Sequence, residues 1–181
     1  MKGSQGETVF DSQEVEDMLR ALALALAAQH QDLESLALVG IRTGGAHLAR
    51  RLQELLAELG DGRPLLGIID ITLYRDDWTR LHKRPKVGKT ELDFSMEGRR
   101  VVLVDDVLFT GRTVRAALDA LIDFGRPRFI ELAVLIDRGH RELPIQPDYV
   151  GAALEVDQDE VIDVLLREEG QEEDQVVRRR L

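Results

Sequence analysis

The chain has 181 residues, no cysteine and a formal net charge of −10 at pH 7. Without cysteine it has neither a disulfide framework nor a thiolate nucleophile. Its acidic balance argues against broad, non-specific nucleic-acid binding, although a local basic patch is compatible with it. The length predicts one domain, residues 1–181, with a sizeable core. No apolar signal region begins the chain, and no charge-free apolar stretch reaches the ~18 residues of a membrane span, so a cytoplasmic location is expected.

Residues 12–29 are dense in alanine and leucine and are predicted to form a helix. Residues 21–26 alternate Ala and Leu as a strand would, but the propensity of both residues over this length favours helix. Ser12 is a plausible helix start. Because much of the circumference is apolar, we expect this helix to pack between other elements or into a subunit contact.

Three apolar runs predict buried strands, and a polar loop follows each of them. The strands are expected at residues 36–41, 65–73 and 129–136, and the loops at 42–45, 74–89 and 137–141. Ligands of open parallel sheets bind outside the carboxyl ends of the strands, so these loops are predicted to converge on one site. Asp70 is either a structural hydrogen-bond acceptor or a group that faces this site.

The loop at residues 42–45 precedes a helix predicted from about 46 to 59 and closed by Gly60. A plain turn is the simplest interpretation, but Arg42 beside two glycines at a helix N-terminus also suits an anion. Residues 74–89 are the most basic stretch and contain Pro85 and Gly88, which predicts a long loop. It is either a solvated surface loop or a lid over a polyanionic substrate, and we favour the lid.

The most informative stretch is residues 101–118. A buried strand at 101–104 leads into Asp105 and Asp106, then a tight turn at 108–111, then a helix that ends at Gly125. The free N–H groups of the first helical turn favour a phosphate, and Thr110 and Thr113 add hydroxyl donors. Two carboxylates would repel phosphate but suit hydroxyl groups or a hydrated cation. A ribose 5-phosphate offers hydroxyl groups to the acidic pair and a phosphate to the first helical turn. The predicted apolar face of the helix is Val114, Ala117, Leu118, Leu121 and Ile122.

Two alternatives compete with this interpretation. A strand followed by two acids also occurs in P-loop ATPases, but the nearest phosphate-loop match, residues 87–90, has Lys83 where the first glycine belongs. A strand–helix unit without a ligand is the other alternative. Two acids followed by Thr-Gly-Arg-Thr are poorly suited to packing in a hydrophobic core, so a binding site is favoured.

Residues 101–113 resemble the phosphoribosyl-diphosphate (PRPP) motif of type I phosphoribosyltransferases: four apolar residues, two acids and a Thr-Gly-rich loop. Residues 70–77, 125–127 and 137–145 resemble one branch of that family, the pyrimidine-operon regulators that are also uracil phosphoribosyltransferases. The resemblance implies an α/β fold with a central, mostly parallel sheet flanked by helices. It weakens after residue 151, and residues of about 151–181 are expected to form a small C-terminal hood, a hairpin or a helix–strand piece, over the site.

The resemblance also implies roles for individual residues. Those expected to act on the ribose and the departing diphosphate are Asp105, Asp106, Arg42 and Arg75. Those expected to bind the phosphates of PRPP are Thr43, Gly44, Val107, Leu108, Phe109, Thr110, Gly111, Arg112 and Thr113. The lid would contribute Tyr74, Lys83, Arg84 and Lys86. The base pocket would be formed by Ile136 as an apolar platform, Asp137 and Arg138. Mg²⁺ would be held mainly by PRPP oxygens and water, not by the protein alone.

The implied partners are PRPP, uracil, UMP and pyrimidine-operon mRNA, with assembly into a homodimer or homotetramer and no role for DNA or a membrane. The sequence departs from the branch where RNA is concerned, because its first helix carries Glu14, Glu16 and Asp17 where relatives carry basic residues. A separate departure concerns the loop that would grip pyrophosphate, where the family usually has an arginine at the position of Gly44, so Arg42 is expected to carry more of that grip. RNA affinity depends on cations that neutralise phosphates. His140 and Arg141 remain as RNA candidates, and the open alternatives are a different RNA surface, an enzyme without RNA binding, or another base such as a purine or orotate.

Overall fold

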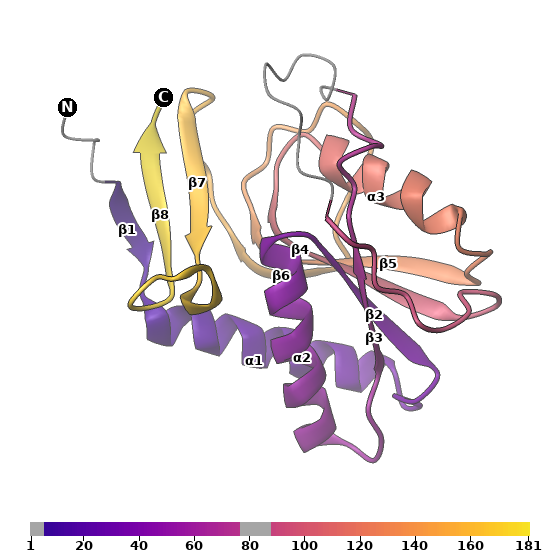
Figure 1. Ribbon diagram of the computed structural model, residues 1–181. Coiled ribbons are helices and arrows are strands. Elements are labelled where there is room, and N and C mark those ends of the chain that lie inside the picture. Colours follow the sequence, from indigo (N-terminus) through magenta and orange to yellow (C-terminus); the bar gives the residue numbers. More distant parts are fainter. Residues whose placement is uncertain (1–5, 77–87) are drawn as a thin grey trace.

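A computed structural model describes residues 6–76 and 88–181. The expected lid residues Lys83, Arg84 and Lys86 therefore lie outside the described residues. The main sheet is parallel, with the strand order β3-β2-β4-β5-β6 (Figure 1). Its strands are β2 (Leu36–Ile41), β3 (Leu65–Ile69), β4 (Arg100–Leu108), β5 (Phe129–Asp137) and β6 (Tyr149–Ala153). This order confirms the predicted central parallel sheet.

Both faces of the main sheet are covered by helices, which explains why its strands are continuous apolar runs. Leu38 and Val102 face one side, where α1 (Ser12–Gln29) and α2 (Gly44–Leu59) pack. Val39 and Leu103 face the other side, which α3 (Arg112–Ile122) covers. Figure 1 shows α1 and α2 on the side of the sheet opposite to α3. The sheet is thus the middle layer of three.

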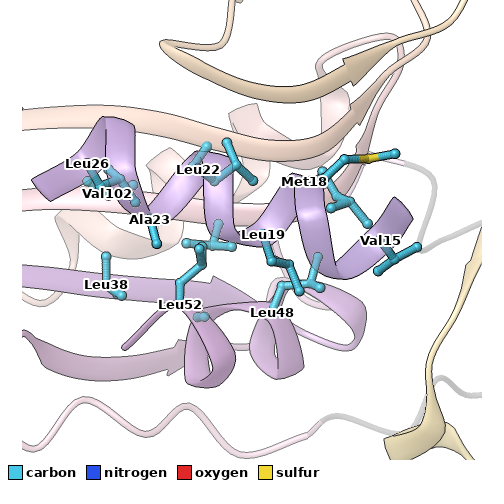
Figure 2. Close-up of a cluster of buried hydrophobic side chains, with 14 of the residues drawn as sticks. Val15, Met18, Leu19, Leu22, Ala23, Leu26, Leu38, Leu48, Leu52 and Val102 are labelled. Atoms are coloured by element: carbon cyan, nitrogen blue, oxygen red, sulfur yellow. The ribbon is translucent and has the colours of Figure 1, made fainter. Parts of the chain in front are cut away.

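Helix α1 confirms the helical interpretation of the Ala-Leu run. Its N-cap is Asp11, whose carboxylate accepts from the Gln13 and Glu14 N–H groups while Glu14 accepts from the Asp11 N–H. This capping box fixes the start of the helix. Figure 2 shows the buried stripe of α1, which includes Leu19 and Leu22, facing α2 and the sheet. The helix therefore packs between other elements of its own chain, the first of the two predicted placements.

A second, antiparallel sheet contains β1 (Glu7–Phe10), β8 (Gln175–Arg180) and β7 (Glu160–Leu165) in that order. The predicted C-terminal hairpin is confirmed as β7–β8, joined through a short 3-10 turn at Arg167–Glu169. The pairing of β1 with β8 was not predicted. Ile162 and Val176 belong to the same buried cluster as α1 and α2, so the small sheet shares the core of the main one.

An ion-pair cluster fastens the β7–β8 connection to α2. Arg51 donates to the carboxylates of Glu168 and Asp174 at 2.6 to 3.0 Å, and Asp174 also accepts the Arg167 N–H at 2.9 Å. These hydrogen bonds, from Asp174 first and Glu168 second, raise the pKa of Arg51. Because the Asp174 side chain is only 10% exposed, it depends on this partner.

We expect Arg51→Ala to destabilise the fold by about 2 kcal/mol, because it leaves the Asp174 carboxylate buried without its cation. Thermal unfolding followed by circular dichroism measures this loss. Arg20→Ala is the matched control, since the Arg20–Glu16 pair is exposed and should leave the midpoint nearly unchanged. Equal midpoints for Arg51→Ala and Arg20→Ala would contradict the anchoring role.

Three local predictions need correction or refinement. The strand predicted at 65–73 ends at Ile69, because Asp70 turns the chain by accepting the Thr72 N–H at 2.8 Å and the Gly88 N–H at 2.6 Å. Asp70 is thus a structural acceptor. Ile122 of α3 is 61% exposed and does not belong to the buried face of that helix. Strand β6 was not predicted.

No helix within the described ranges is long and apolar enough to cross a membrane.

Candidate active site

The N-terminus of α2 lies unusually close to the end of β4, and two glycines permit this approach. A Cβ on Gly45 would lie 3.0 Å from the Asp105 Cα, and a Cβ on Gly44 would lie 2.8 Å from the Asp106 Cγ. A side chain on Gly45 would meet the backbone of β4 and separate the helix from the strand, whereas one on Gly44 would meet the Asp106 side chain. The turn before α2 and the acidic pair, predicted separately from the sequence, are therefore adjacent in the structure. The peptide bond between Arg42 and Thr43 is cis.

Asp105 and Asp106 lie in β4 and have different surroundings. Asp105 is 5% exposed, and its carboxylate accepts the Asp106 N–H at 3.0 Å. Burial, followed by the negative charge of Asp106, raises the pKa of Asp105 well above its usual value. Asp106 is half-buried and accepts the Val107 N–H at 2.8 Å. The pair thus has one buried carboxyl group with a raised pKa and one more accessible carboxyl group.

We expect Asp105→Asn to raise the melting temperature at pH 8. A pKa that is raised in the folded state means that the fold loses stability as pH rises from the ordinary carboxyl value of about 3.9 towards the raised one. Asparagine removes that loss, and each unit of pKa corresponds to about 1.4 kcal/mol, which for a chain of this size is roughly 3 °C or more. Calorimetry at pH 8 and pH 4 should show the difference shrinking at the lower pH. A lower melting temperature than wild type at pH 8 would contradict this assignment.

The loop between β4 and α3 is built to present backbone N–H groups. Gly111 has φ +90° and serves as the N-cap of α3, while the Thr110 hydroxyl accepts the Arg112 N–H at 3.3 Å. The Thr110 carbonyl accepts the N–H groups of Glu142 and Leu143 at 3.0 and 3.1 Å, which fixes the loop against the segment after β5. The loop therefore has a supported shape with its first helical turn open.

A cavity of about 320 Å³ lies over this loop. It brings together most of the residues predicted to hold ribose and phosphate, and it is lined by Arg75, Asp76, Asp105, Val107, Leu108, Phe109, Thr110, Gly111, Arg112, Thr113 and Val114. The lining combines the Asp105 carboxylate with the loop and first turn at the N-terminus of α3, whereas Asp106 and the predicted residues 42–44 are not part of it. The arrangement suits a ligand with hydroxyl groups beside a phosphate.

Arg42 reaches from the turn before α2 to the segment after the lid. Its Nη2 donates to the Lys89 carbonyl at 2.8 Å and to Glu91 Oε1 at 3.1 Å, and its buried Nε has no hydrogen-bond partner among the described residues. Glu91 was not singled out in the sequence, because a contact across 49 residues leaves no periodic signal. Residues 88–90 form no helix, which rules out the P-loop alternative.

The beginning of the expected lid is tied to α3. The Tyr74 hydroxyl donates to Asp123, which raises the pKa of Tyr74, and the Tyr74 carbonyl accepts from Arg115 at 2.8 Å. Tyr74 thus packs beside the core and does not line the cavity. Arg112 joins the phosphate loop to Asp76 and to Glu142, each at 2.6 Å. These two acidic partners were also missed by the sequence interpretation.

The expected base pocket differs from its prediction at Ile136. This side chain is fully buried in the cluster beneath α1 and α2, so it offers no platform at the surface. The exposed surface comes from Phe109, whose ring lies 3.8 Å below the Arg138 guanidinium. A hollow of about 540 Å³ adjoins the stack, with the loop after β5 on one side and the β6–β7 connection on the other. It is lined by Arg138, Gly139, His140, Leu154, Glu155, Val156 and Asp157.

Asp137 and Arg141 hold the loop after β5 in shape. Burial alone would raise the pKa of Asp137, but hydrogen bonds from Arg141 at 2.6 Å and from the Gly139 N–H at 2.9 Å lower it overall. Arg141 also donates to three carbonyls and is only 13% exposed. His140 is exposed, and its Nε2 lies 2.8 Å from the Val156 carbonyl. Arg141 is thus committed to internal contacts.

A family model described as "Phosphoribosyl transferase domain" matches residues 5–168. Among solved structures, a hypoxanthine phosphoribosyltransferase from Staphylococcus aureus superposes with a TM-score of 0.65 at 22% identity, covering 86% of this chain and 81% of that one. The Trypanosoma cruzi hypoxanthine phosphoribosyltransferase has a TM-score of 0.67 at 20% identity, covering 85% and 81%. The fold is that of a phosphoribosyltransferase.

Closer relatives share the name bifunctional protein PyrR. The chain is 52% identical to that of Syntrophobacter fumaroxidans over 160 residues, which are 88% of this chain and 86% of the relative. It is 50% identical to that of Deinococcus radiodurans over 161 residues, 89% and 88% of the two chains. The chain belongs to the phosphoribosyltransferase family, in the group of the bifunctional PyrR proteins. This confirms the family resemblance drawn from residues 101–113 and the resemblance to one branch drawn from residues 70–77, 125–127 and 137–145.

Proposed function

We propose that the chain is a uracil phosphoribosyltransferase, converting uracil and PRPP into UMP and diphosphate, and that it also regulates pyrimidine-operon expression by UMP-dependent mRNA binding. One observation carries the enzymatic half. The cavity brings the buried Asp105, whose neighbour Asp106 is half-buried, together with the loop and first turn that begin α3. Carboxylates accept hydrogen bonds from sugar hydroxyls, and backbone N–H groups bind phosphate, so the site suits a sugar phosphate. Membership of the bifunctional PyrR group supports uracil as the base.

In this proposal the reaction breaks the bond between the ribose anomeric carbon and the diphosphate oxygen and forms a bond from that carbon to a uracil nitrogen, which loses its proton to the departing diphosphate. The transition state is a positively charged, oxocarbenium-like sugar. Asp105, which lines the cavity, and Asp106 hold the ribose hydroxyls, and the charge of Asp106 favours the developing cation. The amides of residues 109–113 bind the 5-phosphate and orient the sugar.

The diphosphate leaves towards the turn before α2. Arg42 and the backbone at Thr43 and Gly44 bind it, and Mg²⁺ accompanies PRPP as part of the substrate, bound mainly by diphosphate oxygens and water. Gly44 adds no charge, so Arg42 carries more of this contact together with Arg75. The lid residues Lys83, Arg84 and Lys86 close over the anion, while Tyr74 anchors the start of the lid to α3.

The base binds in the hollow beside the Arg138–Phe109 stack, where the backbone of residues 137–139 reads the uracil edge. A panel of uracil, orotate and hypoxanthine, each with PRPP and Mg²⁺, tests this assignment by nucleotide formation. We expect UMP as the product at a rate far above the other two. Turnover of hypoxanthine alone would contradict the choice of base and leave the PRPP site standing.

The regulatory half is tested by electrophoretic mobility of the 5′ leader RNA of a pyrimidine operon, with and without UMP, at a fixed salt concentration. A UMP-dependent shift supports the regulator. Absence of a shift, with uracil turnover intact, would leave an enzyme without RNA binding.

We also propose that residues 1–181 act as one cytoplasmic phosphoribosyltransferase domain, with the hood at about 151–181, and that it assembles as a homodimer or homotetramer. Because the apolar stripe of α1 is used inside the chain, the subunit contact must involve other surfaces. Sedimentation equilibrium showing only monomer would contradict this assembly.

A further inference from the structure

Four arginines gather at the end of the main sheet opposite to the candidate active site. They lie on residues 98–100, which lead into β4, and on residues 126–129, which lead into β5. The Arg128 N–H donates to the Arg99 carbonyl at 2.8 Å, the Gly98 N–H donates to the Arg126 carbonyl at 2.9 Å, and Arg100 is the register partner of Phe129. The two segments therefore form one surface, the arginine–phenylalanine patch, made of Arg99, Arg100, Arg126, Arg128, Phe124 and Phe129.

The guanidinium groups of this patch are not held in ion pairs. None of its four arginines forms an ion pair within the described part of the chain, whereas Arg51, Arg112 and Arg178 each bind two carboxylates. The nearby acids are already engaged: Glu97 accepts the Arg126 N–H at 3.1 Å, and Glu131 accepts from Tyr149 at 3.0 Å. In a chain of net charge −10, such a local excess of cations favours an anionic partner.

The patch also exposes aromatic rings. Phe129 is 48% exposed, with the guanidinium groups of Arg100 and Arg128 at 5.2 and 5.3 Å from its ring centroid, and Phe124 is 45% exposed. Flat cations beside an exposed ring are surfaces on which nucleobases stack while the same cations contact phosphates.

A hollow of about 280 Å³ adjoins the patch at Arg100. It is lined by Gln29, His30, Gln31, Asp32, Ser35 and Arg100. These side chains offer amide, hydroxyl and carboxylate groups, the donors and acceptors that read the edge of an unstacked base. Arg100 thus connects a stacking surface with a polar recess.

We propose that the arginine–phenylalanine patch binds a single-stranded segment of RNA, with phosphates on Arg100 and Arg128, one base on Phe129 and a neighbouring base in the adjoining hollow. The proposal rests on the RNA-binding half of the proposed function and assigns that half a surface. It also accounts for an acidic α1 and for an Arg141 committed to internal bonds, because neither is then needed for RNA. The patch is remote from the cavity over the phosphate loop, so both ligands can be bound together.

The test measures the affinity of the full chain for the leader RNA by fluorescence anisotropy, with saturating UMP and over a salt series. The double variant Arg100→Gln/Arg128→Gln should bind at least about 10-fold more weakly, with the slope of log K against log salt reduced by about 1.4 for two lost phosphate contacts on a single strand. Phe129→Leu should weaken binding by about 5-fold or more without changing that slope, because it removes stacking only. Uracil turnover should be unchanged in both.

The matched control is Arg20→Gln/Arg63→Gln, which removes two exposed arginines elsewhere and should retain wild-type affinity. Wild-type affinity in the patch variants would overturn the proposal. A changed sedimentation mass with unchanged RNA binding would also overturn it, since the patch would then be a contact between copies of this chain. If wild type itself fails to bind RNA, the regulatory half of the function fails with the patch, whereas uracil turnover would still stand.

Discussion

Asp106→Asn should lower uracil turnover by about 100-fold or more while leaving the fold intact. The substitution removes the negative charge that faces the reacting sugar, and groups of this kind typically contribute roughly 10² to 10³ in rate. The amide oxygen of the substituted side chain can still accept the Val107 N–H, as the Asp106 carboxylate does at 2.8 Å, so the end of β4 keeps its shape. Steady-state kinetics in uracil and PRPP measure the effect, and thermal unfolding measures the stability.

The loss should fall mainly on kcat, because the charge matters most when the sugar carries positive charge. Asp61→Asn is the matched control: Asp61 is an exposed carboxylate just after α2, and its removal should change neither rate nor stability. Unchanged turnover in Asp106→Asn would show that this carboxylate does not act on the ribose.

Alanine at the two glycines that begin α2 should separate activity from stability. In Gly45→Ala the new Cβ would meet backbone atoms, 3.0 Å from the Asp105 Cα, so α2 must move away from β4. Overpacking of this kind costs about 1–3 kcal/mol, and we expect a melting temperature lower by roughly 5 °C together with lost turnover. In Gly44→Ala the Cβ would meet the Asp106 side chain, 2.8 Å from its Cγ, and that side chain can turn.

Gly44→Ala should therefore lower turnover by about 10-fold or more by displacing Asp106, with little loss of stability, since alanine also favours the helix. Gly60→Ala is the control, because its Cβ would meet the end of the Leu33 side chain at 3.1 Å and the Leu56 carbonyl oxygen at an ordinary contact distance of 4.0 Å. Calorimetry and kinetics on the three variants give both readouts. A Gly45→Ala variant as stable and active as wild type would contradict the close approach of α2 to the acidic pair.

The sequence predicted the centre of the fold because its strands are buried on both faces. Runs such as residues 101–104 carry no polar alternation, but the strand predicted there is longer than expected, because β4 includes the acidic pair and ends at Leu108, just before the Thr-Gly loop. Strands β1 and β6 were not predicted, because they are short and partly exposed. Neither a continuous apolar run nor a regular alternation of apolar and polar residues identifies them.

Contacts between segments far apart in the chain could not be predicted from the sequence either. The sequence identifies Arg42 as a candidate but does not reveal that Glu91 and the Lys89 carbonyl hold its guanidinium. Ile136 looked like a platform because it precedes the polar loop. Which face of β5 it joins depends on the register with β4, and that register places it under α1 and α2. Burial of this kind is a property of the assembled layers.

The central claim is that the acidic pair, the loop at 107–113 and the turn at 42–44 bind one PRPP molecule. A crystal structure of the chain with PRPP and Mg²⁺ tests it most directly. We predict the 5-phosphate on the N–H groups of residues 110–113, the ribose hydroxyls on Asp106 and the diphosphate beside Arg42. A PRPP molecule bound with its 5-phosphate elsewhere, or with no ribose contact to Asp106, would contradict the account.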